Sequence, residues 1–338
     1  MRDNVRVTIL LDHPDYFQDL RRLLKAKLPR SQEMIFPKLF RQNILSKNKI
    51  IVKMIFNFFF LIVHLSTVNN KSDFYVCTGF HAIPFLVIHQ FLKFRGKILI
   101  TNFYLHAAGE NKLLRKMLSL IFHDNIHIIL QSRYEYEQYR KSYPLIHPYF
   151  IPYSQDEIQK AYQGLSSEDR GYVFSGGYTN RDYDTLLKAA EMLPYRFVIA
   201  CSRLNKLPDR IPKNVTVHRE VSAEEFHTLM AKSRLIVLNL KDQIGSSGQM
   251  VALAGLSFRK PIVYSRNESI SHYFQDGKSG FSYVMRNLDD LKNKIEYLMK
   301  NDKTRSEIAE EGYQYYKNNF LEIHKNDQIL RIILEPCV

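Results

Sequence analysis

Short apolar runs alternate with segments of helical spacing along this chain of 338 residues. In the first half, the runs that predict strands are Val5–Leu11, Phe74–Thr78, Lys97–Asn102 and Asn125–Gln131. The segments whose apolar positions predict helices are Tyr16–Leu28, Ala82–Phe94 and Tyr134–Ser142. Because strands that alternate with helices are typical of parallel sheets, we expect a doubly wound α/β architecture here.

The second half repeats this alternation. Strands are predicted at Tyr172–Ser175, Phe197–Cys201, Val215–His218, Leu235–Leu240 and Ile262–Tyr264. Helices are predicted at Tyr183–Leu193, Ala223–Ala231, Met250–Phe258, Leu288–Asn301, Thr304–Asn319 and Asp327–Leu334. Since 338 residues exceed what one hydrophobic core usually holds, we expect two domains of ordinary size, divided near residues 152–170.

Composition narrows the class of protein. Hydrophobic residues make up 45% of the chain, which is enough for two cores. The three cysteines, Cys77, Cys201 and Cys337, are too few and too scattered for a disulfide framework or a zinc site. The first residues lack the uninterrupted apolar region of a secretory signal. Together these features predict a cytoplasmic protein.

Positive charge is concentrated in the first half of the chain. Residues 1–150 hold 22 Lys and Arg against 10 Asp and Glu, whereas residues 151–338 hold 26 against 24. The first half therefore carries +12 of the total +14. Such asymmetry indicates an anionic partner of one domain, and nucleic acid, an anionic bilayer or a lipid diphosphate would each fit.

The most apolar stretch of the chain is Ile50–Leu65. Lys53 and Asn57 interrupt it, and its uninterrupted part, Phe58–Leu65, is well short of the ~20 residues that a membrane span needs. A buried or partly exposed helix is the leading interpretation. A helix lying on a membrane surface and a true span are the alternatives.

A polar loop follows the predicted strand Leu235–Leu240. Ser246, Ser247 and Gly248 can present hydroxyl and backbone N–H groups at the start of the next helix, where the helix dipole favours an anion. Gln249 adds a side-chain amide. The alternative is an ordinary polar loop that caps a helix.

Residues 244–280 resemble the donor-binding segment of GT-B glycosyltransferases, in particular family four. The family pattern is E-x7-E-A-x-A-x-G-K-P-V-V, followed by G-x-x-E and D-G-x-x-G. The sequence RKPIV at residues 259–263, Glu268, and DGKSG at residues 276–280 correspond to its later elements. Ser246 and Ala254 stand where the family has its two glutamates.

The resemblance implies the GT-B fold, in which two Rossmann-like doubly wound domains face a central cleft. It covers residues 171–320 well and the first domain only in outline. It implies an acceptor-binding domain over residues 1–152 and a nucleotide-sugar-binding domain over residues 165–320. Residues 321–338 are expected to form a helix that returns to the first domain.

A glycine pair follows the predicted strand Tyr172–Ser175. Gly176 and Gly177 would let the backbone approach a diphosphate closely, and Arg181 could bind its oxygens through two N–H groups. The turn resembles the family element G-R-L-x-x-x-K-G. The alternative is a capped helix with a surface arginine.

The resemblance also implies roles for residues near the ends of other strands. Glu268 matches a family position that contacts the donor sugar or ribose, with helix capping as the alternative. His218 and Arg219 follow Val215–Val217, where this fold often binds the nucleobase. No metal is expected, because GT-B enzymes commonly work without one and no D-x-D motif stands in a suitable place.

Candidate catalytic residues in the first domain are Asn102 and His106, which come just after a predicted strand. A histidine there could position an acceptor hydroxyl or accept its proton. Asp12 and His13, after the first strand, are further candidates. With 12 histidines in the chain, a structural role for any one of them is the alternative.

We therefore expect a glycosyltransferase that moves a sugar from a nucleotide-diphosphate donor to a hydroxyl of a glycan acceptor, lipid-linked or at the cell surface. Such a role in polysaccharide biosynthesis would place the basic first domain against an anionic membrane surface, and nucleic acid is not the expected partner. A nucleotide-sugar epimerase of the same fold and a non-catalytic basic module that binds membrane or nucleic acid are the alternatives.

Overall fold

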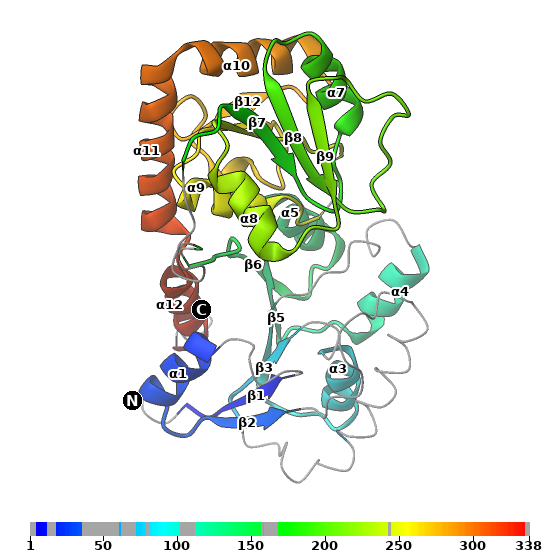
Figure 1. Cartoon of the computed structure of the whole chain (residues 1–338). Helices are drawn as coiled ribbons and strands as arrows, with labels where there is room; N and C mark the ends of the chain where they lie inside the picture. The colour runs from blue at the N-terminus through cyan, green and yellow to red at the C-terminus, as the bar shows by residue number, and fades with distance from the viewer. Residues whose placement is uncertain are drawn as a thin grey trace. The chain divides into compact units, whose positions relative to one another are not determined.

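The computed structural model describes residues 5–11, 18–35, 61, 72–78, 82–101, 112–156, 158, 168–242 and 245–334. Its internal contacts divide the chain into two compact units. Unit 1 comprises Met1–Gln131, Glu135–Pro152 and Lys325–Val338, and unit 2 comprises Ser132–Tyr134 and Tyr153–His324. Each unit contains one described sheet of six strands with helices around it (Figure 1).

The sheet of unit 1 has the strand order β2-β1-β3-β4-β5-β6, and its described neighbours all pair in parallel. Its strands are β1 (Val7–Leu11), β2 (Gln32–Ile35), β3 (Phe74–Thr78), β4 (Lys97–Thr101), β5 (Ile126–Leu130) and β6 (His147–Phe150). Its helices are α1 (Gln18–Lys27), α3 (Ala82–Phe91), α4 (Lys112–Ile121) and most of α5 (Arg133–Ser142) and of α12 (Glu322–Leu334).

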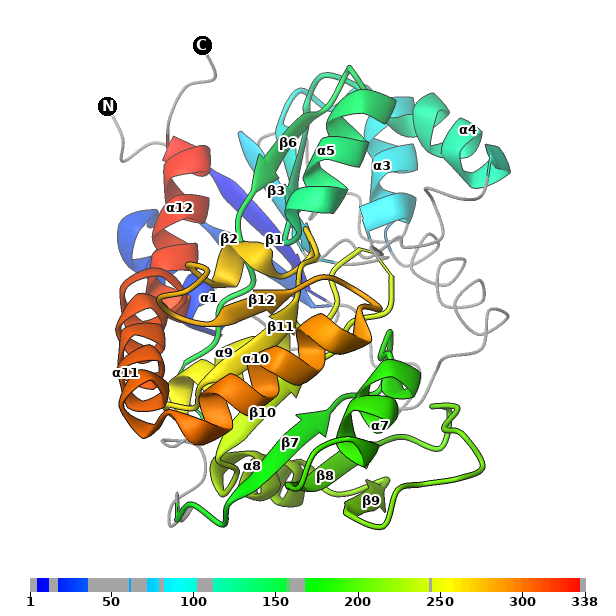
Figure 2. The ribbon, with the colours of Figure 1, turned by 90° about the horizontal axis from the view of Figure 1, so that it is seen from above.

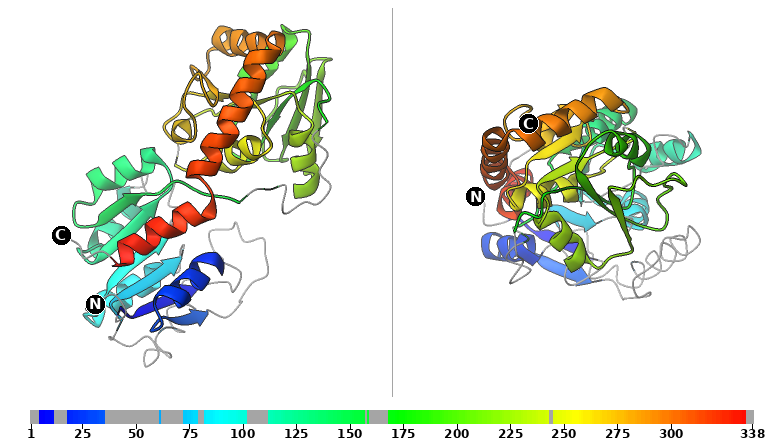
Figure 3. Two further views of the ribbon diagram at one scale, coloured as in Figure 1. Left: turned by 90° about the vertical axis from the view of Figure 1, so that its left-hand side faces the viewer. Right: turned by 45° about the horizontal axis from the view of Figure 1, so that its top comes forward.

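Apolar side chains on both faces of this sheet explain its helical cover. On one face, Leu10 and Cys77 join a core with residues of α3, α4 and α5. On the other face, Ile9 and Val76 pack with residues of α1 and with Ile329 of α12 (Figure 3). Strands buried on both faces read as continuous apolar runs, which is why the sequence pattern revealed them.

The sheet of unit 2 has the order β12-β11-β10-β7-β8-β9 and is parallel throughout its described pairs. Its strands are β7 (Tyr172–Gly176), β8 (Arg196–Cys201), β9 (Val215–Arg219), β10 (Leu235–Leu238), β11 (Ile262–Ser265) and β12 (Phe281–Tyr283). Its helices are α7 (Tyr183–Glu191), α8 (Ala223–Ala231), α9 (Gln249–Ser257), α10 (Leu288–Lys300) and α11 (Asp302–Asn319), with the short helix η4 (Ser271–Tyr273).

Alternate residues of the central strands face opposite layers of unit 2. Val173 and Val237 pack with α7 and α10, whereas Phe174 and Ile236 pack with α8, α9 and α11. Figure 2 shows α10 crossing the sheet. Helix α9 is apolar around nearly its whole circumference, and only Met250 among its residues is exposed. This helix therefore forms part of the core, and its amino end is held at the edge of the sheet.

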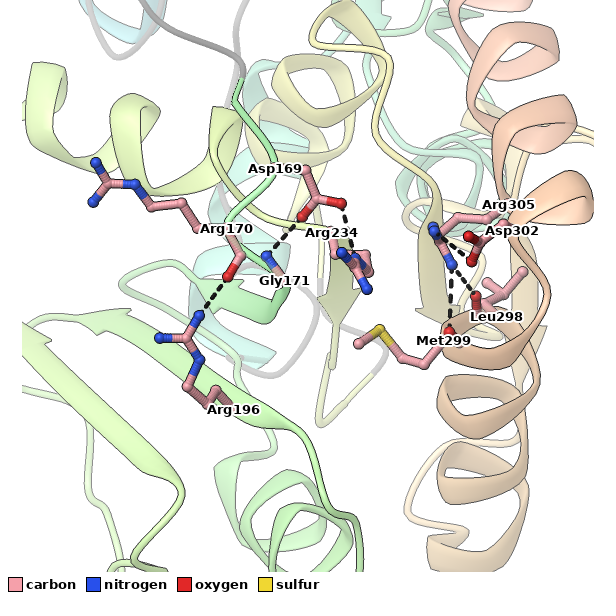
Figure 4. A network of polar contacts seen from close by, with 9 residues as sticks. All are labelled: Asp169, Arg170, Gly171, Arg196, Arg234, Leu298, Met299, Asp302 and Arg305. Carbon is pink, nitrogen blue, oxygen red and sulfur yellow. Dashed lines mark hydrogen bonds and ion pairs between the residues drawn. The ribbon is translucent and has the colours of Figure 1, made fainter.

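Polar contacts tie together the amino ends of the strands of unit 2 (Figure 4). Asp169 accepts hydrogen bonds from the Gly171 backbone N–H at 2.7 Å and from Arg234 Nε at 2.8 Å. Burial opposes ionisation of Asp169, but these two donors outweigh it and lower the pKa of the carboxyl group. Nearby, Arg305 donates to the carbonyl oxygen of Leu298 at the end of α10. These contacts hold the amino ends of the strands together. Ligands of open α/β sheets bind at the opposite edge, where the carboxyl ends of the strands lie.

The doubly wound α/β architecture expected from the sequence is confirmed, with element ends shifted by a few residues. Strands β2 and β12 and helix α4 were not predicted. These two strands lie at sheet edges, where fewer side chains need to be apolar. No helix within the described residues combines the length and apolarity needed to cross a bilayer. Of the segment Ile50–Leu65, only Leu61 is described, and it is buried.

Candidate functional site

The strand order of unit 2 creates a switch point between β7 and β10. From β7 the chain continues outward through β8 and β9, and from β10 it continues in the opposite direction through β11 and β12. The loops after β7 and β10 therefore leave adjacent strand ends toward opposite sides. In open α/β sheets, ligands bind in the crevice that this divergence creates at the carboxyl ends of the strands. Both segments that the sequence singled out for phosphate binding lie at this point.

Buried polar side chains join the two loops at their base. Ser175 Oγ donates to Asn239 Oδ1 at 2.6 Å, and Asn239 Nδ2 donates to the backbone oxygen of Asp182 at 2.7 Å. The Asp182 backbone N–H donates to the Asn239 backbone oxygen at 2.8 Å. Asp182 also caps α7 by accepting from the Thr185 N–H at 3.1 Å. These contacts fix the start of α7 against the end of β10.

Asn180 links the same loops further out. Its Nδ2 donates to the Asp242 backbone oxygen at 2.8 Å, and its Oδ1 accepts from the Asp242 N–H at 3.0 Å. Asn180 has φ 53°, a left-handed conformation that asparagine tolerates better than most residues. Asn267, after β11, donates from Nδ2 to the same Asp242 oxygen at 2.9 Å. Three strand-end loops are thus held in one arrangement.

Gly177 and Arg181 form a compact turn after β7. Arg181 Nε donates to the Gly176 oxygen at 2.9 Å, and its Nη1 donates to the Thr179 oxygen at 2.7 Å. Gly177 has φ 130°, and a Cβ atom there would collide with the Arg181 guanidinium. The backbone conformation and the close guanidinium therefore both favour glycine at this position. Burial lowers the pKa of the Arg181 guanidinium, although an arginine stays charged in proteins.

The amino end of α9 lies at the other side of the switch point. Gly248, the residue before the helix, has φ 82° and provides no side chain to accept from the first helical N–H groups. Ser247 is 6% exposed, and its buried Oγ has no hydrogen-bond partner among the described residues. A buried hydroxyl without a partner is costly, so a ligand oxygen is its natural complement. Ser246 is half-buried and Gln249 is buried beside it.

Ala254 stands at the position of the family's second glutamate, and it has no polar group that could contact a ligand. Ala254 lies in α9 at 1% exposure, packed in the core. Glu268 lies in the turn after β11 with its side chain exposed. Asn267 rather than Glu268 caps this turn, since its Oδ1 accepts from the Ser269 N–H at 2.8 Å. The contact of Glu268 with a donor stays a prediction.

The D-G-x-x-G segment is a structural turn. Asp276 accepts from the Ser282 N–H through Oδ1 at 2.6 Å and from Ser282 Oγ through Oδ2 at 2.7 Å. Gly277 has φ 78°, which favours glycine in this turn. These contacts fix the start of β12 beside β11.

The strand predicted over Val215–His218 extends to Arg219, so His218 and Arg219 both lie in β9 and do not follow it as their proposed role assumed. The ladder with β8 continues to Arg219, which pairs with Cys201. His218 Nδ1 lies 3.5 Å from Glu225 Oε1, and Arg219 Nη1 donates to the Ser202 oxygen at 3.0 Å. They lie at the end of the edge strand, two strands from the switch point, and contact with a nucleobase stays a prediction.

The candidate residues of the first domain lie outside the described residues. This applies to Asn102 and His106 and also to Asp12 and His13. Among the residues that the structure describes, no three His, Cys, Asp or Glu side chains gather closely enough to hold a metal ion.

Sequence reasoning missed the polar network beneath the switch point, formed by Ser175, Asn180, Asp182, Asn239 and Asp242. A signal was present for Asn239, because an amide that directly follows the apolar run LIVL is unusual at a buried position. Asn180 gave a weaker signal as a turn residue. Their partners come from different loops, so spacing along the chain could not pair them.

Comparison with known families matches residues 181–334 to a family described as glycosyl transferase-like. An uncharacterized glycosyltransferase of Methanocaldococcus jannaschii is 28% identical over 153 residues. This match covers 43% of the present chain and 42% of that relative, so the chain spans less than half of the relative's length.

Solved structures resemble the chain over nearly its whole length. Sucrose-phosphate synthase from Thermosynechococcus elongatus has a TM-score of 0.71 at 12% identity, with 97% of this chain and 98% of that chain covered. HepE from Anabaena, solved with UDP-glucose, has a TM-score of 0.65 at 13% identity, with 97% and 99% covered. The chain thus has the GT-B fold of glycosyltransferases, with two Rossmann-like units.

Proposed function

We propose that this protein is a glycosyltransferase whose nucleotide-diphosphate sugar donor binds at the switch point of unit 2. The observation that carries the proposal is the buried Ser247 hydroxyl, without a described partner, two residues before the start of α9, where the N-cap residue Gly248 makes no side-chain hydrogen bond. This feature lies within residues 181–334, the part that matches the glycosyl transferase-like family. The structural relative HepE has been solved with UDP and with UDP-glucose, which supports a donor of this class.

The geometry suits departure of a diphosphate. When the glycosidic bond to the donor phosphate breaks, negative charge builds on the phosphate oxygens. The first N–H groups of α9 have no carbonyl acceptor within the helix, and the helix dipole favours an anion beside them. The Ser247 hydroxyl can donate to the same oxygens. Backbone donors held by a buried helix need little reorganisation as the charge develops.

Arg181 is proposed as the cationic group of the site, together with Gly176 and Gly177. In the present structure its guanidinium donates to two carbonyl oxygens of its own turn. Arginine has five N–H donors, so a phosphate can use those that the turn leaves. Glu268 is proposed to contact the donor sugar or ribose, and His218 and Arg219 to lie toward the nucleobase. Catalysis without a metal is part of this proposal.

Unit 1 is proposed to bind the acceptor, a hydroxyl of a glycan that is lipid-linked or at the cell surface, with Asn102 and His106 as candidate catalytic residues. The net charge of +12 over residues 1–150 supports an anionic acceptor or surface. Peripheral contact with an anionic membrane and a role in polysaccharide biosynthesis follow from such an acceptor.

A panel of nucleotides tests the donor assignment. UDP and GDP should raise the melting temperature more than UMP and GMP, because the proposed site recognises the diphosphate. At 100 times Kd, the expected stabilisation is about 2.7 kcal/mol. Turnover is then followed with sugar nucleotides and glycan acceptors as release of free nucleoside diphosphate. An epimerase would convert the sugar nucleotide without this release, and a non-catalytic binding module would show neither response.

A further inference from the structure

A second surface of unit 1 combines exposed apolar and basic side chains. At the end of α3, Phe91 is 84% exposed and Leu92 is 47% exposed. On α4, Met117 is 56% exposed and Leu120 is 69% exposed. Single exposed apolar side chains are common, but a cluster of large ones is typical of interaction surfaces.

The four side chains come from two neighbouring helices, because α3 and α4 contact each other (Figure 2). Gln90 Nε2 donates to the Leu120 backbone oxygen at 3.3 Å, which ties the end of α3 to the end of α4. Met117 and Leu120 are three residues apart in α4 and lie on one side of it. Leu118, between them, is 1% exposed and packs in the core. We call Phe91, Leu92, Met117 and Leu120 the α3–α4 patch.

Positive charge surrounds the α3–α4 patch. Lys93 and Arg95 line a pocket of about 370 Å³ that also includes His89, Gln90 and His123. On α4, Arg115 and Lys116 are exposed beside the patch.

The acidic and titratable groups near the patch leave its charge positive at neutral pH. Within residues 82–97 and 112–125, Asp124 is the sole acidic residue in the sequence. The His89 and His123 rings stack with their centroids 5.2 Å apart. Burial lowers the pKa of His89 to about 4 and also lowers that of His123, so both are neutral at pH 7. The positive charge of the pocket therefore comes from lysine and arginine.

We propose that the α3–α4 patch and its basic rim dock on an anionic phospholipid bilayer. The apolar side chains would enter the boundary between headgroups and acyl chains, while the lysines and arginines contact lipid phosphates. Basic residues beside large apolar ones are the combination that binds membrane interfaces. The arrangement specifies a surface for the membrane contact in the proposed function, but the docking itself needs no transfer activity.

The strength of each contribution sets the scale of the effect. One basic residue near an anionic surface strengthens binding by about fivefold. Reversal of one charge should thus weaken binding by more than tenfold, and loss of an inserted leucine should weaken it further. Salt should weaken binding as well, because it screens exposed charges.

The test is cosedimentation of the full chain with two kinds of vesicle, one of pure phosphatidylcholine and one of phosphatidylcholine with about 30% phosphatidylglycerol. The test variant is Lys116→Glu with Leu120→Ser, an exposed lysine and apolar residue one helical turn apart on α4. The matched control is Lys188→Glu with Met192→Ser, where Lys188 and Met192 are exposed with the same spacing at α7 of unit 2. Circular dichroism and stabilisation by UDP verify that both variants fold.

We expect the wild type and the control variant to bind the anionic vesicles in a salt-sensitive way. The affinity of the test variant for these vesicles should be at least tenfold lower. A second variant, Lys93→Asn, removes one positive charge and should weaken binding by about fivefold. Asparagine is chosen because it tolerates the φ of 51° at this residue. Equal binding to neutral vesicles, an equal loss in the control variant, or self-association that the test variant abolishes would each overturn it. Loss of UDP stabilisation without loss of vesicle binding would count against the proposed donor site alone.

Discussion

The Ser247→Ala substitution separates a ligand-binding role from a structural one. The Ser247 side chain is 6% exposed, and its Oγ has no described hydrogen-bond partner. A buried hydroxyl that lacks a partner costs about 1–3 kcal/mol. Its removal leaves no large cavity, so the free energy of unfolding should stay the same or rise by about 1 kcal/mol.

Binding of the donor should respond in the opposite direction. A hydrogen bond from Ser247 to a phosphate oxygen involves a charged partner and is worth about 1.5–3 kcal/mol. The Kd for UDP should therefore rise by about tenfold to a hundredfold. Isothermal titration with UDP measures this change, and chemical denaturation of the free protein measures stability.

Ser257→Ala is the matched control, because it removes a buried hydroxyl at the other end of α9. Ser257 Oγ donates to the Ala254 oxygen at 2.9 Å, so the control loses a hydrogen bond within the helix and should bind UDP as the wild type does. If Ser247→Ala instead destabilised the free protein and left the Kd for UDP unchanged, the hydroxyl would be structural and the reasoning refuted.

Other predictions concern the supports of the site and unit 1. Gly177→Ala should lower melting temperature and UDP affinity together, because its Cβ would displace Arg181; an unchanged melting curve would contradict this. Asn180→Ala should cost about 1–2 kcal/mol of unfolding free energy and weaken UDP binding, and Asn180→Asp should recover part of the loss through Oδ1. Burial lowers the pKa of His89 and His127 from 6.5 to about 4. As pH falls, these histidines therefore take up protons in the unfolded protein before they do so in the folded protein. Their contribution to stability is complete above pH 6.5 and is lost as pH falls toward 4, so the melting temperature should fall in that range, whereas a flat profile would contradict it.

The central parts of both sheets could be predicted from the sequence because their strands are buried on two faces. Leu235–Leu238, for example, is a continuous apolar run, which is typical of a strand buried on both faces of a parallel sheet. The edge strands β2 and β12 were missed for the complementary reason. Phe281–Tyr283 has only three residues and its first is half-buried, so it forms no long apolar run.

The candidate site was predictable in its backbone features and not in its polar network. Gly177 and Gly248 have positive φ values at two loop positions that the sequence singled out. The pairing of Asn180 with Asp242 depends on two loops that meet only because β7 and β10 are neighbours. Strand order is a property of the whole unit, and spacing along the chain does not encode it.

The role of Arg181 also depended on three-dimensional detail. The sequence indicated a cation at the mouth of α7, which the structure shows folded back onto the Gly176 and Thr179 oxygens. These carbonyl oxygens compete with an external anion for the N–H groups of Arg181. A sequence motif does not reveal this competition.

The most direct test of the central claim is an NMR titration of backbone amides with UDP. Binding of the diphosphate at the switch point of unit 2 predicts the largest chemical-shift changes at Gly177 and at the amides of residues 248–250. Saturating changes there, absent with uridine alone, would support the account. Changes confined to unit 1 or to the amino edge around Gly171, with Gly177 and Gly248 unaffected, would contradict it.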